Sequence, residues 1–69
     1  MKYAVIQNTD GNFNIVSEWG NADSAIKAWH NQCVLLMNDT SFTEGFVAVI
    51  DSQLNITSQY YQRIAHEQA

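Results

Sequence analysis

The sequence is poor in the residues that staple or break a small fold: it has one cysteine, no proline and three glycines among 69 residues. A single cysteine cannot form a disulfide within the chain, so packing alone, or packing against a partner, has to hold the fold. Uninterrupted apolar runs such as residues 33–37 are far shorter than the roughly 20 residues of a membrane helix, so we expect no membrane association. The N-terminus lacks the layout of a secretory signal, which predicts a cytoplasmic or virion-associated protein.

Positive charge is also scarce, because three Lys and Arg residues face seven Asp and Glu residues and leave a net charge of -4. A phosphate backbone is bound mainly by lysine and arginine, so we expect no nucleic-acid binding. Hydrophobic residues make up 46% of the chain and charged residues 14%, which is typical of a globular domain. We therefore predict a single domain spanning residues 1–69.

The first part of the chain has the pattern of a β-hairpin. Residues 2–8 and 13–19 are rich in aromatic and β-branched side chains, and Asp10-Gly11 between them suits a two-residue turn. Pairing across this turn separates the side chains by parity into two faces. One face is expected to hold Ala4, Ile6, Phe13, Ile15 and Trp19, and the other Tyr3, Val5, Asn14, Val16 and Glu18.

A helix is expected to follow the hairpin. Asn21 is a suitable N-cap, Asp23 lies favourably in the first turn, and the polar segment 38–41 predicts an end near residues 37–39. Apolar residues recur at spacings of three and four and form one stripe, which we expect to dock on the hairpin. The stripe consists of Ala22, Ala25, Ile26, Trp29, Cys33, Leu36 and Met37.

The last part of the chain predicts a second hairpin. Residues 45–50 form a continuous apolar run typical of a buried strand, and residues 54–60 can pair back onto it across a turn at Ser52-Gln53. Residues 60–69 fit an extended strand, a short helix or a frayed tail. The expected fold is α+β, in the order β-β-α-β-β, with a four-stranded, mainly antiparallel sheet and one helix packed on one face.

Reactive side chains are few. His30 and Cys33 lie one helical turn apart, as a thiolate and imidazole pair would, but Lys27 is the only nearby cation and Cys33 belongs to the apolar stripe. We predict that Cys33 is buried and inert, that His30 lies at the boundary of the stripe, and that His66 in the tail has no chemical role. We expect no catalytic residue, no cofactor-binding residue and no metal ligand, and hence no enzyme.

One face of the sheet is expected to remain uncovered, with Tyr3, Val5 and Val16 on it. Only one parity of the second hairpin can join them, which leaves open whether Val47 and Val49 or Phe46, Ala48 and Ile50 do so. Val34 and Leu35 lie outside the helical stripe and are further surplus apolar residues. We therefore predict a homodimer with an interface at Tyr3, Val5, Val16, Val34 and Leu35. In the alternative, the tail 61–69 covers one patch through Ile64 and Ala65.

Several short motifs together suggest a relationship. They are residues 2–7, residues 14–16, Ala25 with Trp29-His30, residues 47–51 and Tyr60-Tyr61. In these motifs the chain resembles very small uncharacterised proteins encoded in phages, prophages and mobile elements of gut bacteria. The resemblance implies a phage-related setting and no catalytic residue.

We expect a small non-enzymatic protein-interaction or structural protein, which acts through self-association or by binding a protein partner. The alternative is an acidic inhibitor of a host nucleic-acid-handling enzyme, of the anti-restriction or anti-CRISPR type.

Overall fold

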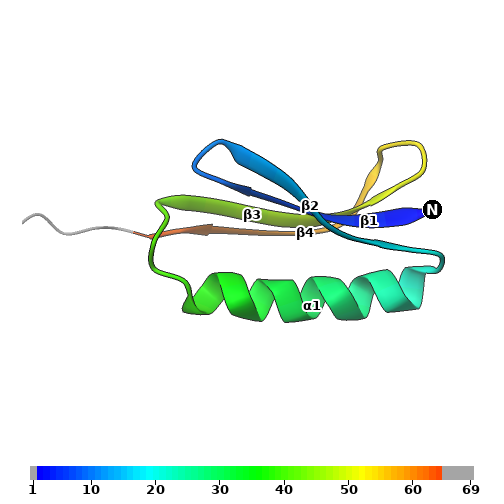
Figure 1. The fold of residues 1–69 in the computed structure, drawn as a ribbon, viewed down its shortest axis with the longest axis horizontal. Coiled ribbons are helices and arrows are strands. Elements are labelled where there is room, and N and C mark those ends of the chain that lie inside the picture. The colour runs from blue at the N-terminus through cyan, green and yellow to red at the C-terminus, as the bar shows by residue number, and fades with distance from the viewer. Residues whose placement is uncertain (1, 65–69) are drawn as a thin grey trace, which may run out of the picture.

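The computed structural model describes residues 2–64 and contains one antiparallel sheet with one helix. The elements are β1 (Tyr3–Thr9), β2 (Asn12–Trp19), α1 (Ala22–Asn38), β3 (Glu44–Asp51) and β4 (Ile56–Arg63). The strand order in the sheet is β2-β1-β3-β4, and α1 lies along one face (Figure 1). This confirms the predicted α+β fold and its β-β-α-β-β order.

The first hairpin turns at the expected two residues. Asp10 and Gly11 both have positive φ, 51° and 86°, which is the backbone of a type I′ turn. The register pairs Ile6 with Ile15 as predicted, but β2 then contains a bulge that shifts the pairing between Val5 and Ile6. Because a bulge opposes two residues to one, Trp19 lies opposite Tyr3 and not on the face of Ile15. The expected placement of Trp19 was therefore wrong.

The second hairpin has a longer connection than expected. The amide of Leu54 donates to the carbonyl of Asp51 at 3.0 Å across Ser52-Gln53, and Leu54 has a φ of 65°. A turn followed by a left-handed residue is a common three-residue hairpin loop. β4 begins at Ile56 and runs to Arg63, so the segment from Tyr60 is an extended strand in that part; residues 65–69 lie outside the described chain.

The helix begins and ends where the sequence predicts. The Asn21 side-chain oxygen accepts a hydrogen bond from the Ser24 amide at 2.8 Å, and α1 ends at Asn38. Its inward side differs in one respect: Leu36 is buried, whereas Met37 is 51% exposed, although it was expected in the stripe. Consecutive helical residues are about 100° apart, so the rotation that directs Leu36 inward turns Met37 outward.

The core lies between α1 and one face of the sheet. Val5, Val47 and Val49 are fully buried there, and Tyr3 packs against them. The prediction that Tyr3 and Val5 lie on the uncovered face is therefore wrong. Both faces of the first hairpin are apolar, so hairpin pattern alone did not select the face that the helix covers. Within residues 2–64, no helix has the length and apolar character required to cross a membrane.

Candidate interaction surface

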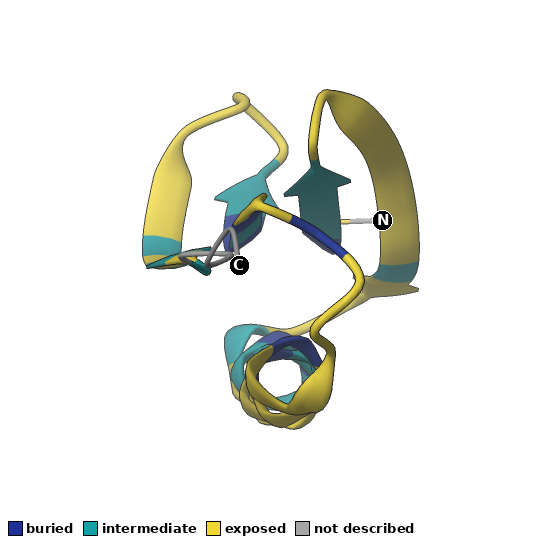
Figure 2. Ribbon diagram, turned by 90° about the vertical axis from the view of Figure 1, so that its left-hand side faces the viewer, coloured by how far each residue is buried: buried dark blue, intermediate teal, exposed yellow. Residues whose placement is uncertain are grey.

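The face of the sheet opposite α1 carries large apolar side chains from all four strands. Register and alternation place on it Ile6, Phe13, Ile15, Phe46, Ile50, Ile56 and Tyr61. Both hairpins curl away from the helix, so the backbone of the sheet is concave on this side (Figure 2). We call it the open face.

The central strands and the edge strands of the open face differ in how far their side chains are exposed. Ala4 and Ala48 on the central strands are 1% and 0% exposed, although no element covers them. On the edge strands, Ile15 is 58% exposed and Tyr61 is 55% exposed, and Phe13 and Ile56 are similarly exposed. The exposed apolar area of the open face therefore comes mainly from its two edge strands.

The middle of the open face contains a local repeat, which does not extend to Phe13, Phe46 and Tyr61 at one end. Residues 4–6 and 48–50 have the same sequence, Ala-Val-Ile, and pair with each other on the antiparallel strands β1 and β3. Each segment is flanked by a bulged edge strand that supplies an isoleucine, Ile15 opposite Ile6 in β2 and Ile56 opposite Ile50 in β4. An approximate two-fold axis therefore passes through the middle of the face.

The predicted interface residues do not come together in one surface. Tyr3 and Val5 lie beneath the helix, and Val16 lies at the β2 bulge and is 41% exposed. Val34 and Leu35 are exposed on α1, as expected for residues outside the stripe. In β3, Val47 and Val49 face the helix, and the alternating residues Phe46, Ala48 and Ile50 lie on the open face. An interface role for Val16, Val34 and Leu35 stays a prediction.

A shallow hollow of about 340 Å³ lies at one end of the open face. Its lining consists of Asn8, Asp10, Gly11, Glu44, Gly45, Phe46 and Tyr61. The Asp10 carboxylate accepts hydrogen bonds from the amides of Thr43 at 3.0 Å and Glu44 at 2.9 Å. Asp10 thus joins the first hairpin turn to the start of β3, which gives this carboxylate a structural role.

The other carboxylates with described hydrogen bonds also serve loops. Asp39 accepts hydrogen bonds from the hydroxyl and the amide of Ser41, which lower its pKa. Asp51 accepts from the amides of Asn55 and Gln53, and these bonds likewise lower its pKa. These groups lie at different ends of the molecule and form no common acidic surface. The alternative of an acidic inhibitor stays a prediction.

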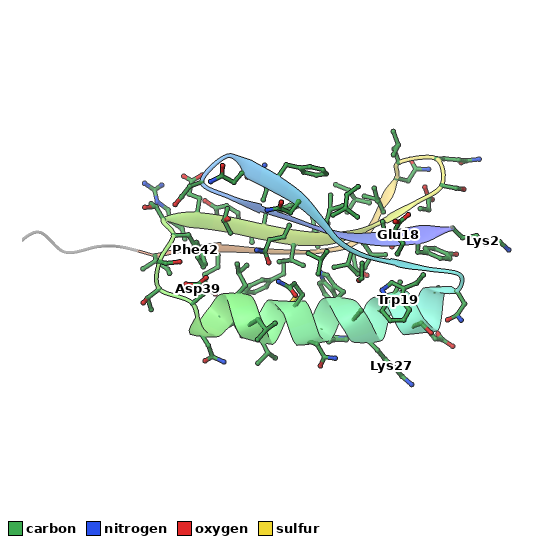
Figure 3. The ribbon with its side chains drawn as sticks, viewed as in Figure 1. Lys2, Glu18, Trp19, Lys27, Asp39 and Phe42 are labelled. Atoms are coloured by element: carbon green, nitrogen blue, oxygen red, sulfur yellow. The ribbon has the colours of Figure 1, made fainter. Side chains whose placement is uncertain are left out.

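Phe42 is the residue of greatest structural importance that the sequence pattern did not single out. It lies in the polar loop between α1 and β3, yet it is only 3% exposed and belongs to the core (Figure 3). The Thr43 carbonyl accepts the Ile64 amide at 2.8 Å, so this loop is held to the end of β4 as well as to Asp10. The available signal was a single large aromatic residue among polar neighbours.

Cys33 and His30, the two reactive side chains of α1, lie in different surroundings. Cys33 is buried as predicted, and burial raises the pKa of its thiol, whereas His30 is exposed and its ring lies against Trp29. In the described part of the chain, no three His, Cys, Asp or Glu side chains gather as a metal site would require. His66 lies outside the described residues.

We expect the Cys33 thiol to react with a thiol reagent more than about tenfold slower in the native protein than in the unfolded chain. The thiolate is the reactive form, and burial disfavours it, so below the raised pKa the native thiol stays protonated. Stopped-flow labelling in buffer and in denaturant measures both rates. Equal rates would contradict the buried, inert assignment.

Comparison with known proteins found no matching family model, no matching curated protein and no matching solved structure.

Proposed function

We propose that this protein acts by binding another protein through its open face, and not by catalysing a reaction. The observation that carries the proposal is the set of large apolar side chains that all four strands contribute to the face without a helix. Contiguous exposed apolar patches of several hundred Å² are uncommon on monomeric proteins and mark interaction sites. On the basis of the sequence resemblance, the proposal also places this protein in a phage or mobile element, in the cytoplasm or the virion.

The open face also has the construction of a binding site. Its large side chains come from rigid strands and not from loops, so they are ordered before a partner arrives. Aromatic residues, which are enriched at the centres of interfaces, lie on it at Phe13, Phe46 and Tyr61.

The test compares three immobilised forms of the chain in a lysate of cells that encode it. Wild type and Leu35→Asp are expected to retain the same protein, and Ile15→Asp is expected to lose it. Leu35 is the matched control because it is as exposed as Ile15, 61% against 58%, but lies on α1. Circular dichroism checks that each variant is folded. Equal retention by all three forms would contradict the proposal.

A further inference from the structure

We infer that the occupant of the open face is a second copy of this chain, which gives a two-sheet sandwich with both helices on the outside. This inference rests on the proposed function and names the partner. It follows from the area of the face, its charge and its symmetry.

The apolar area of the open face reaches the lower limit for a specific interface between two copies. A fully buried aromatic side chain removes about 150–250 Å² of surface from solvent. Four residues of the edge strands are each just over half exposed, so together they leave roughly 400 Å² of side-chain surface exposed in one copy. These residues are Phe13, Ile15, Ile56 and Tyr61. With the half-buried Ile6, Phe46 and Ile50, two copies together bury roughly 1,000 Å², which is the size at which specific interfaces begin.

The charges at the ends of the open face nearly cancel, because Lys2 and Arg63 lie there with Glu18, Glu44 and Asp10, although the whole chain carries a net charge of -4. At one end, Lys2 precedes β1 and its amide donates to the carbonyl of Trp19, next to Glu18. At the other end, the register places Glu44 directly opposite Arg63. Two of the three fixed positive charges of this acidic chain thus border the open face. A second copy therefore meets a smaller excess of like charge there than the net charge of the chain would suggest.

The symmetry of the face fits an isologous contact. A two-fold dimer uses the same patch on both copies, so the patch has to be complementary to itself. In the middle of the face, the repeated segments 4–6 and 48–50 place Ile6 and Ile50 in equivalent positions, so this part of the patch is the same in both orientations of a second copy. Two sheets that pack face to face bury their facing side chains in one common layer.

The edges of the sheet are less suited to pairing than its face. Both edge strands contain a bulge, at Val16 in β2 and at Thr57 in β4. A bulge bends an edge strand and interrupts its hydrogen-bonding pattern, which hinders the addition of a further strand. We therefore place the contact between the two sheets on the open face and not on a sheet edge.

Light scattering and sedimentation equilibrium on the purified chain, over a wide concentration range, test this inference. We expect wild type to reach twice the 7.8 kDa mass of one chain. Ile15→Asp and Ile56→Asp, which are equivalent under the approximate two-fold axis, should each weaken dimerisation at least about 100-fold, because each buries an unpaired charge in both copies. Leu35→Asp should leave the dimer unchanged.

A milder variant tests the same inference without placing a charge at an apolar position, where it could unfold the chain. Gln59 lies on the open face opposite Ala48 and is already polar and exposed, so Gln59→Arg should keep the fold and still weaken the dimer. A single-chain mass at all concentrations would overturn the second-copy inference, while face-dependent retention in the lysate would still support the proposed function. A dimer lost only with Leu35→Asp would also overturn the inference, because it would place the contact on α1.

Discussion

Replacing Phe42 by alanine is expected to lower the free energy of unfolding by about 3–5 kcal/mol, the usual cost of truncating a buried phenylalanine. Phe42 is 3% exposed and packs in the core formed by α1 and β3. A domain of this size has a total stability of roughly 3–10 kcal/mol, so Phe42→Ala should leave much of the protein unfolded at room temperature. Urea unfolding followed by circular dichroism measures the change.

The control for this prediction is Phe42→Leu. Leucine keeps most of the apolar contact and should cost less than about 1.5 kcal/mol. The measurement belongs at the lowest usable protein concentration, so that self-association does not add to the stability. A loss below about 1 kcal/mol for Phe42→Ala would show that Phe42 is not part of the core.

Replacing Gly45 by alanine is expected to destabilise the protein by about 1–3 kcal/mol through overpacking. A Cβ atom at this position would lie 2.6 Å from Cε2 of Phe42 and 3.0 Å from Cδ1 of Leu36. Gly45 thus permits the ring of Phe42 to lie against the backbone of β3. Thermal unfolding of the variant, compared with wild type, tests the expected loss.

Gly20→Ala is the matched control, because a Cβ atom there would meet nothing within 4 Å. It should be neutral or stabilise the protein by up to about 1 kcal/mol. In the background of Phe42→Leu, which lacks the ring atoms nearest to the new Cβ, Gly45→Ala should cost less than it does in wild type. Equal costs in both backgrounds would exclude a contact between residues 42 and 45 as the cause.

The bends and ends of the elements could be predicted because they depend on local chemistry. Asp10-Gly11 tolerates positive φ in both positions, and Asn21 offers an oxygen to the first turn of α1. The order of strands and helix followed from the spacing of apolar residues. Such signals act over a few residues, so they can be read without knowledge of the rest of the chain.

Contacts between distant residues could not be predicted in the same way. The carboxylate of Asp10 binds amides 33 and 34 residues later in the chain, and the indole of Trp29 donates to the carbonyl of Val47. Nothing in the neighbourhood of either residue indicates its partner. These contacts arise only once the sheet and the helix are packed together.

Which face of the sheet stays open also depended partly on local sequence and partly on tertiary packing. Alternation determined which residues of β1 share a face: Tyr3 with Val5, and Ala4 with Ile6. Both sets are apolar, so the sequence alone left either one available to the helix. Tertiary packing placed the valines of β1 and β3 under α1, and the bulge in β2 moved Trp19 to the same side. Ile6, Phe46 and Ile50 of the same two strands remained on the open face because one helix can cover only one side of a sheet.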